Sequence, residues 1–290
     1  MGTLSSKIDF ALIFSAEDAN VNGDPLNGNR PREDYDGYGE MSDVCIKRKI
    51  RNRLQDMGEK IFVQSDDRAT DGFKNLKDRA DSISDLKVAW KNKDREEYAK
   101  IACEKWIDVR SFGQVFAFSK SKDSDEVSVP VRGPVSIRMA KSVSPVDIID
   151  MQITKSVNGE NKDGKSGKSS DTMGMKHFVD FGVYVIKGSI NPQLAEKTGF
   201  SDEDAEKIKE ALKTLFENDC SAARPDGSMQ VCRLIWWKHN GKTPKHSSAK
   251  VHGSLSVTPK DGCKKPRSID DYDIEIAELD GMKPEIFDDI

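Results

Sequence analysis

The sequence contains no long run of apolar residues and few cysteines, and both shortages exclude classes of protein. No apolar stretch approaches the roughly 18 residues that a membrane-spanning helix needs, so we expect no membrane segment. The N-terminal MGTLSSKIDF has no basic segment leading into an apolar core, which argues against a secretory signal. The five cysteines are scattered and form no CxxC pair, which argues against a disulfide framework and a zinc knuckle. These shortages predict a reduced, cytoplasmic protein.

Groups that could bind a metal ion or a cofactor are also sparse. The four histidines lack the spacing of metal ligands and read as ordinary surface or loop residues: His177, His239, His246 and His252. The sequence has no dense cluster of carboxylates, which a hard cation such as Mg²⁺ would need. We therefore predict no metal site, no cofactor and no catalytic residue.

Charge is unevenly distributed along the 290 residues. The formal net charge is -4, but residues 270–290 hold nine acidic residues and one lysine, a net charge of -8. The other 269 residues therefore carry +4, with cations clustered at 47–53 and again at Lys264, Lys265 and Arg267. A mildly acidic chain can present a basic surface, because the local field decides what binds. The acidic segment either serves a neighbour's basic surface or is simply a strand with its carboxylates outward.

The densest cationic segment, residues 42–53, is predicted to form a helix. Ile46, Ile50 and Leu54 recur every four residues, and Met57 extends the same apolar stripe. Five basic residues fall within seven positions beside the stripe: Lys47, Arg48, Lys49, Arg51 and Arg53. A helix that buries one side and presents a row of cations on the other suits a phosphate backbone. A solvated basic face without a ligand stays open as the alternative.

The rest of the pattern predicts an α+β protein. Alternating apolar residues predict strands at 7–15, 106–118, 178–190, 231–238, 251–257 and 271–279. Residues 74–106 have a charged helical pattern, and 201–218 form the clearest helix, with Ser201 as its cap and Asp204 at the capping-box position. Residues 127–157 are typical of an extended hairpin arm, and 158–171 of a mobile loop.

Without the insertions, these elements follow the order strand–helix–strand–strand–helix–strand. This order is typical of the ferredoxin-like fold that RNA-recognition modules share. The aromatic signature with which those modules stack bases is missing, so we expect a nucleic acid to be held mainly through its backbone.

Seven short motifs occur in an order that resembles a known family. They are Asn22-Gly23-Asp24-Pro25, Asn29-Arg30-Pro31-Arg32, Asp43-Val44-Cys45-Ile46-Lys47-Arg48-Lys49-Ile50-Arg51, Asp108-Val109-Arg110-Ser111-Phe112-Gly113, Arg132-Gly133-Pro134-Val135, Thr172-Met173-Gly174 and Asn218-Asp219-Cys220-Ser221-Ala222-Ala223-Arg224. Together they resemble the repeating backbone subunit of type I CRISPR Cascade complexes, in the type I-C (Dvulg subtype) branch of the Cas-seven superfamily. The resemblance covers nearly the whole chain.

The resemblance implies one modified RRM-like domain over 1–290 with a ferredoxin-like/RRM-like palm. Residues 60–105 would form a helical fingers insertion, and 120–175 a β-hairpin thumb with a mobile loop. Copies would stack head to tail along one CRISPR guide RNA, and each thumb would displace a base and touch the next copy. The implied partners are the guide RNA, target DNA paired to it, other copies and other Cascade subunits. Base pairing would then supply the sequence specificity.

The resemblance also implies a set of RNA-binding residues. Lys47, Arg48, Lys49 and Arg51 would line the guide groove, and Arg132, Arg138 and Lys141 would lie near the base of the thumb. The thioether of Met173 would form an apolar wedge at a displaced base, and Arg30 and Arg224 would touch RNA as well.

Several of these roles have alternatives that stay open. Met173 could instead be a core residue, Arg30 an ordinary surface residue, and Arg110 either an RNA contact or a member of a structural ion pair. The segment that leads to Arg224 also has a turn-forming role after the preceding helix.

Two other functions stay open. The first is a metal-dependent ribonuclease on the same palm, as in related type III complexes, with Asp24 or Asp34 as the loop aspartate. The second is a structural protein that assembles without RNA. The cationic helix argues against the second, because five like charges on a filament would repel one another without a polyanion.

Overall fold

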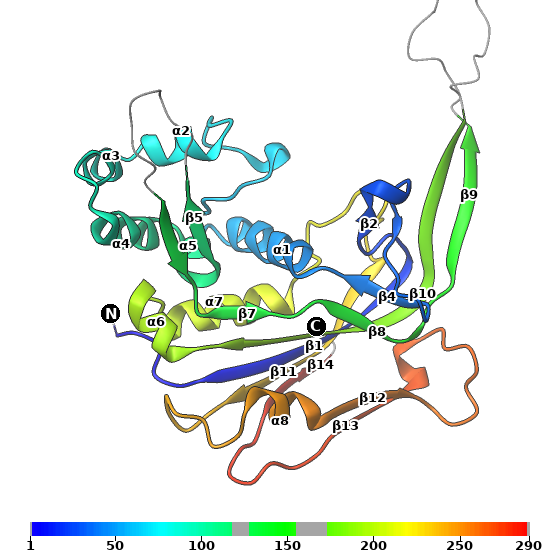
Figure 1. Cartoon of the computed structure of the whole chain (residues 1–290). Coiled ribbons are helices and arrows are strands. Elements are labelled where there is room, and N and C mark those ends of the chain that lie inside the picture. The colour runs from blue at the N-terminus through cyan, green and yellow to red at the C-terminus, as the bar shows by residue number, and fades with distance from the viewer. Residues whose placement is uncertain (1, 118–127, 155–172, 289–290) are drawn as a thin grey trace, which may run out of the picture.

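The computed structural model describes residues 2–117, 128–154 and 173–288, and its centre is an eight-stranded antiparallel sheet (Figure 1). The main path through this sheet is β14-β11-β1-β10-β8-β4, and β7 and β9 also pair with β10. The strands are β1 (Ile8–Ala19), β4 (Tyr38–Met41), β7 (Val135–Ile137), β8 (Ala140–Pro145), β9 (Ile148–Thr154), β10 (Met173–Ile190), β11 (Met229–Lys238) and β14 (Glu285–Asp288).

Three two-stranded ladders and a set of short helices complete the described part. The ladders join β2 (Gly23–Asp24) with β3 (Arg30–Pro31), β5 (Gly113–Phe116) with β6 (Val129–Arg132), and β12 (Leu255–Pro259) with β13 (Tyr272–Ile276). The helices are α1 (Asp43–Asp56), α2 (Leu76–Asp81), α3 (Ser84–Lys91), α4 (Arg95–Lys105), α5 (Ile107–Phe112), α6 (Pro192–Thr198), α7 (Asp202–Lys213) and α8 (Ser248–Gly253). None of these helices has the length and apolar content needed to cross a membrane.

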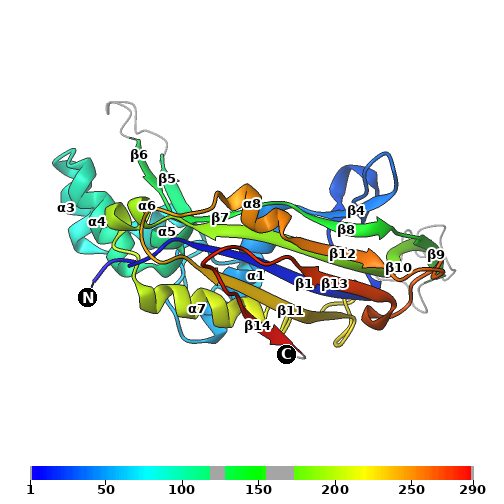
Figure 2. The ribbon, with the colours of Figure 1, turned by 90° about the horizontal axis from the view of Figure 1, so that it is seen from below.

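The central strand β1 is buried on both faces. Phe10, Leu12 and Phe14 belong to the main core, which α1 and α7 cover. Ala11 and Ile13 belong to a second core on the opposite face, beneath α8 and the β12–β13 hairpin (Figure 2). Side chains on a strand alternate between faces, so this sheet needs a cover on each side. Burying one large apolar side chain contributes about 1.5–3 kcal/mol, so the buried residues of β1 contribute to stability from both faces of the sheet.

The helical insertion has a separate core of its own. Phe62 packs against Trp106 and Phe116, with ring centroids 4.7 and 5.1 Å apart. Tyr98 of α4 meets Phe116 of β5 at 5.1 Å. Leu86 and Ala102 complete the same cluster, so α2, α3 and α4 are held by their own apolar side chains rather than by the main sheet.

An arm projects from the sheet where β9 pairs with the first part of β10 (Figure 1). The register runs from Met173 opposite Thr154 to Val179 opposite Ile148. Both faces of this two-stranded arm carry exposed apolar side chains: Ile149, Met151, Ile153, Met173 and Met175. The arm therefore presents apolar surface that nothing in the described chain covers.

Most of the expected elements are confirmed. Helices are combined with a large antiparallel sheet, as predicted. The strands expected at 7–15, 178–190 and 231–238 are present, and 74–106 is helical. Ser201 and Asp204 form the predicted capping box at the start of α7, although this helix ends at Lys213 rather than at residue 218.

Three predictions from alternation were wrong. Residues 106–118 begin with the helix α5 before β5, and 251–257 begin inside α8. The single arm expected over 127–157 divides instead: β6 pairs with β5, β7 and β8 pair with β10 inside the main sheet, and only β9 belongs to the arm. Alternation shows that a strand is half-buried but does not say which strand it pairs with. The mobile loop expected at 158–171 lies outside the described residues.

The close packing of β10 against β1 gives a stability prediction at Gly188. A Cβ atom added there would overlap the Phe10 ring and lie 2.8 Å from the carbonyl oxygen of Ser136. We expect Gly188→Ala to lower the free energy of unfolding by about 1–3 kcal/mol, as overpacking does in other cores. Urea denaturation measures this, with Gly253→Ala as the control because a Cβ there has no neighbour within 4 Å. Equal stability of the two variants would contradict the described packing.

The second core also predicts a dependence of stability on pH. Burial lowers the pKa of His252, and the cations Lys187 and Arg138 add to this effect, while Asp9 opposes it. The unfolded chain therefore binds the proton more tightly, so the free energy of unfolding falls as the pH drops below about 6.5. We expect His252→Gln to reduce this loss between pH 7.5 and 5 in urea titrations. An unchanged pH profile would show that His252 does not contribute.

Candidate nucleic-acid interface

Helix α1 lies between the helical insertion and the arm (Figure 1). Its start is fixed by Ser42, whose hydroxyl accepts a hydrogen bond from the Cys45 amide at 3.3 Å. The side chain of Asn22 in turn accepts from both the amide and the hydroxyl of Ser42, each at 2.9 Å. The predicted stripe of Ile46, Ile50 and Leu54 is fully buried against the sheet, so the opposite side of α1 faces outward.

Two arginines on α1 are held in place by the start of the helical insertion. Arg51 Nε donates to Asp108 Oδ2 at 3.0 Å, and its guanidinium lies 5.1 Å from the centre of the Phe112 ring. Asp108 is fully buried and also accepts from the amides of Phe62 and Val63. Arg48 donates to the carbonyl of Val63 at 2.6 Å. Asp108 thus fixes Arg51 and the chain at Phe62 and Val63, and the carbonyl of Val63 in turn holds Arg48.

The two guanidinium groups lie close enough to affect each other. Burial lowers the pKa of Arg48, and the positive charge of Arg51 lowers it further. A guanidinium remains charged at neutral pH even so, because its ordinary pKa is far above 7. Each arginine uses only part of its five N–H donors in the contacts above, so both can still donate to an anion. A phosphate at this position would relieve the repulsion between them.

Lys49 does not stand in the exposed cationic row that was expected. It is 3% exposed, pairs with Asp219, and lies 5.6 Å from the centre of the Phe216 ring. Position 49 precedes Ile50 on the helix and falls on the buried side. The expectation of one continuous basic face is therefore wrong at this position.

The other cations of α1 also have acidic partners. Lys47 Nζ lies 2.9 Å from Asp43, one turn earlier on the same helix, and remains partly exposed. Arg53 contacts Glu217 at 2.6 Å and donates to Thr214 at 2.7 Å, which ties α1 to the end of α7. Lys47 is therefore accessible, whereas Arg53 links two helices.

Arg110 forms a structural ion pair, one of the two alternatives left open. It lies on α5, and its Nε and Nη2 contact the two carboxylate oxygens of Asp204 at 2.9 and 2.7 Å. Burial alone would lower the pKa of Arg110, but the hydrogen bonds and charge of Asp204 outweigh it and raise the pKa. Asp204 is the capping residue of α7, so this pair joins the helical insertion to the main core.

The three cations expected near the base of the arm do not lie together. Arg132 is on β6, opposite Gly113 and beside the helical insertion. Lys141 is opposite Val185 on β10, on the sheet face that α1 does not cover, and it pairs with Asp34. Arg138 follows β7, and its amide bonds to the carbonyl of Lys187 on the same part of β10. Arg132 is therefore separate from Arg138 and Lys141, which both lie beside β10.

The base of the arm is tied to the loop that contains Arg30. Asp150 of β9 pairs with Arg30 and accepts from His177 at 2.6 Å. Those hydrogen bonds, first from His177 and then from Arg30, lower the pKa of Asp150. Further along the arm, Met173 is 62% exposed, so the alternative of a core methionine is excluded. Gln152 contacts its sulfur at 3.2 Å.

Arg224 lies near the N-terminal half of α1, in the segment that follows α7, where its charge acts on Cys45. Its Nε contacts Asp219 at 3.3 Å, the same carboxylate that pairs with Lys49. The carboxylates Asp108, Asp204 and Asp219 were not predicted as partners of cations, although each holds a cation of the expected site, and Asp204 was predicted only as a capping-box residue. Asp108 and Asp219 stand inside the motifs quoted for the family resemblance, and this position in the motifs could have identified them from the sequence.

The aspartates of the alternative ribonuclease are both engaged with cations. Asp24 caps a short 3₁₀ turn by accepting from the Leu26 amide, and it contacts Arg32 at 3.2 Å. Asp34 pairs with Lys141 and accepts from two amides of its own loop, and the hydrogen bond from Lys141 is the main cause of its lowered pKa. Within the described residues, no group of three or more acidic, histidine or cysteine side chains could hold a metal ion.

Known proteins resemble this chain over most of its length. The family model for CRISPR-associated protein Cas7 matches residues 6–277. A protein of Haloferax volcanii named CRISPR-associated protein Cas7 is 30% identical over 234 residues, which cover 76% of this chain and 67% of that protein.

A solved structure is similar in fold. It is a chain of a CRISPR RNA-guided surveillance complex in its pre-nicking state, with a TM-score of 0.51 and 18% identity. The match covers 89% of this chain and 83% of that one. The family match spans nearly all the elements described above, and the chain belongs to the CRISPR-associated protein Cas7 family.

Proposed function

We propose that this protein is a CRISPR RNA-binding backbone subunit of a type I Cascade complex, in the type I-C branch. Copies polymerise head to tail along the guide RNA and present it for pairing with target DNA. The observation that carries this proposal is the Arg48–Arg51 pair on α1, in which Arg51 is held by the buried carboxylate of Asp108 and Arg48 by the carbonyl of Val63. The similarity to a chain of an RNA-guided complex supports the choice of RNA as the ligand.

We assign the main sheet with α1 and α7 as an RRM-like palm. Its strands follow the chain order β1, β8, β10, β11, with α1 between the first two and α7 between the last two. Their order in space is β11-β1-β10-β8. This fourth-first-third-second arrangement with two helices on one face is that of the ferredoxin-like fold.

The fingers and the thumb are assigned to the two parts that flank α1. Helices α2 to α4, within 60–105, are the fingers and carry their own core. The thumb is narrower than the 120–175 first expected, and among the described residues it comprises β9 and the paired part of β10. The acidic pairs at Asp108 and Asp150 fix the fingers and the thumb relative to α1.

The guide path runs along α1 toward the thumb. Lys47, Arg48 and Arg51 contact phosphates, since each has N–H donors beyond those used in its contacts within the chain. Met173 supplies the apolar wedge from the exposed end of the thumb. In this proposal Lys49 and Arg110 position other elements rather than touch RNA, and Arg138 and Lys141 lie outside the groove.

Two further residues border the proposed path. Arg30 approaches it at the base of the thumb, where it pairs with Asp150, and Arg224 approaches it beyond Asp219. Both keep part of the guanidinium exposed, so each can add a phosphate contact without giving up its carboxylate.

Assembly requires a surface that reaches the next copy. Ile149, Met151 and Ile153 alternate along β9 and form one exposed apolar face of the thumb. A two-stranded hairpin that exposes such a face gains stability by packing against another surface. The contact joins different surfaces of two copies, so it grows an open filament whose length the RNA sets. Other Cascade subunits would cap this filament.

Neither alternative function is favoured by a specific contact among the described residues. Asp24 and Asp34 each hold a cation of the chain itself, so we propose no catalytic step. We place the protein in the cytoplasm, and the five free cysteines agree with a reducing compartment.

Removing two cations of α1 tests the guide path. Lys47→Ala together with Arg48→Ala should weaken binding of single-stranded RNA equally for all sequences. The slope of log K against log salt should fall by about 1.4, since each lost single-strand phosphate contact contributes roughly 0.7. Fluorescence anisotropy at several salt concentrations measures this, with Lys242→Ala and Lys245→Ala as a matched control away from α1.

An unchanged slope and affinity would remove these residues from the guide path. Unchanged thermal unfolding of the double variant shows that the loss is not a folding defect. Assembly that persists after ribonuclease treatment and in high salt would instead favour the RNA-independent structural protein.

Shortening the thumb tests assembly. Asp150 and His177 are directly opposite each other, so residues 151–176 can be replaced by an Asn-Gly turn that closes a two-residue hairpin. We expect thermal stability to be kept, because the removed residues of β9 and β10 are exposed, and multi-copy assembly on guide RNA to be lost. Sedimentation velocity measures the assembly. Filaments of normal length would refute the thumb assignment.

A further inference from the structure

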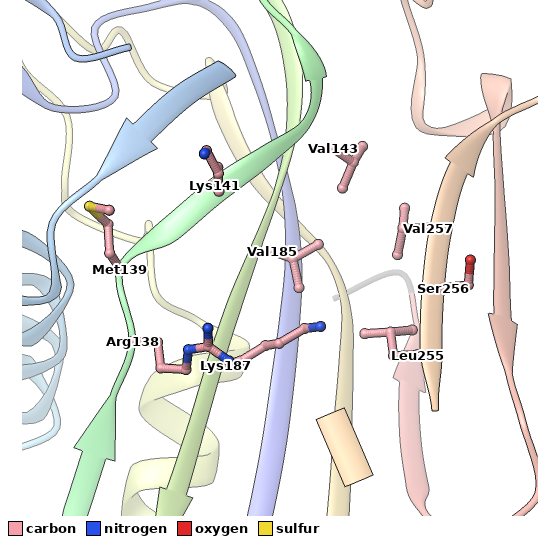
Figure 3. Close-up of a pocket in the computed structure, with 9 residues that line it drawn as sticks. All are labelled: Arg138, Met139, Lys141, Val143, Val185, Lys187, Leu255, Ser256 and Val257. Atoms are coloured by element: carbon pink, nitrogen blue, oxygen red, sulfur yellow. The ribbon is translucent and has the colours of Figure 1, made fainter. Parts of the chain in front are cut away.

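A cavity of about 430 Å³ lies on the sheet face opposite α1, between β8, β10 and β12. Its aliphatic walls include Val143, Val185 and Val257, and three cations are among its lining residues: Arg138, Lys141 and Lys187 (Figure 3). The pairing of β8 and β10 and the second core place this cavity behind the palm, away from the proposed guide path.

An extra residue between β7 and β8 brings these cations together. Gly188 is opposite Ile137 and Val185 is opposite Lys141, so three steps on β10 face four steps on the neighbouring chain. Such a bulge breaks the strict alternation of faces. As a result, Arg138 and Lys141 both lie on the face of Lys187, where regular alternation would have separated them.

The charge at this cavity is only partly neutralised, because Lys141 pairs with Asp34 while the other two cations have no acidic partner among the described residues. Within the described residues, neither Arg138 nor Lys187 forms an ion pair, and Lys187 Nζ donates only to the carbonyl of His252 at 3.0 Å. The buried carboxylate on this face, Asp9, is already bonded to Lys7 and His239. Burial lowers the pKa of Lys187, and the charge of Arg138 lowers it further. Lys187 is therefore a partly buried cation without a counter-ion, which an anion would stabilise, and the exposed Arg138 lies beside it.

We propose that this cavity binds a phosphate ester of nucleotide size. The phosphate lies between Arg138 and Lys187, with Lys141 at the rim, and the rest of the ligand packs on the valines. A guanidinium fork matches phosphate oxygens, and the cavity volume is in the range of small-ligand sites. The phosphate ester could belong to a free mononucleotide or to one nucleotide of a single strand, because both offer the same phosphate and sugar groups to this cavity.

The site is independent of the guide path, since it is on the other face of the sheet and uses other residues. If this cavity binds no phosphate ester, the proposed RNA-binding function is unaffected. If the guide path along α1 is wrong, the proposal for this cavity is likewise unaffected. An acidic segment of a second copy is the alternative ligand for these cations. The aliphatic walls favour a compact organic phosphate over an extended acidic strand, because they offer the rest of such a ligand an apolar surface.

Calorimetric titration of the full chain with AMP and with a five-nucleotide single-stranded DNA tests the site. Lys187→Met and Arg138→Gln should each weaken binding about tenfold, the effect of losing one charge-assisted hydrogen bond. Val257→Phe should weaken it as well, because the ring fills the cavity without changing the charge. Lys250→Met is the matched control, an exposed lysine on α8 outside the cavity, and should bind normally. The double variant at Lys47 and Arg48 should also bind AMP normally.

The outcomes separate the possibilities. AMP binding that depends on Lys187 and Val257 supports a site for free nucleotides, and the same dependence for DNA alone supports a site for a strand. The proposal is overturned if all variants bind like the wild type, or if neither probe binds. If neither probe binds and Lys187→Met self-associates more weakly than the wild type in sedimentation, the cavity binds an acidic segment of a partner protein instead. Equal thermal unfolding of the variants excludes misfolding.

Discussion

The two-sided burial of β1 is the constraint on which the rest of the structure depends. Because Phe10 and Phe14 face one core and Ala11 and Ile13 the other, both faces of the sheet must be covered. α1 and α7 cover one face, and α8 with the β12–β13 hairpin covers the other (Figure 2). Two separate surfaces result, one beside α1 and one beside β8, and each gathers its own set of cations.

Buried carboxylates decide how the cations of the first surface are used. Asp108 holds Arg51, Asp204 holds Arg110 and Asp219 holds Lys49. Each carboxylate joins elements that are distant in sequence, so the cations serve the fold before they serve a ligand. Arg48 and Arg51 are the exception, since they keep free donors on the outward side of α1. A rigid pair of this kind binds phosphate with little loss of side-chain entropy.

The fingers and the thumb differ in how many of their apolar side chains are buried. The fingers have an apolar core of their own, built around Phe62 and Trp106, and are linked to the palm through Asp108. The thumb has no such core, and its exposed residues Met151 and Met173 are left for a partner to cover. In the proposed filament, packing against a neighbouring copy would therefore bury more apolar surface on the described part of the thumb than on the fingers.

The sequence alone determined the parts that depend on local pattern. The apolar stripe of α1, the alternation in β1 and the capping box at Ser201 follow from periodicity and cap chemistry, and the ordered motifs identified the family. Only the tertiary structure decided which cations stay accessible. From the sequence, Lys49 and Arg110 were both candidates for ligand binding. In the folded chain, carboxylates distant in sequence lie against them. The bulge that turns Arg138 to the far face is equally invisible in sequence, because register is a property of two paired strands.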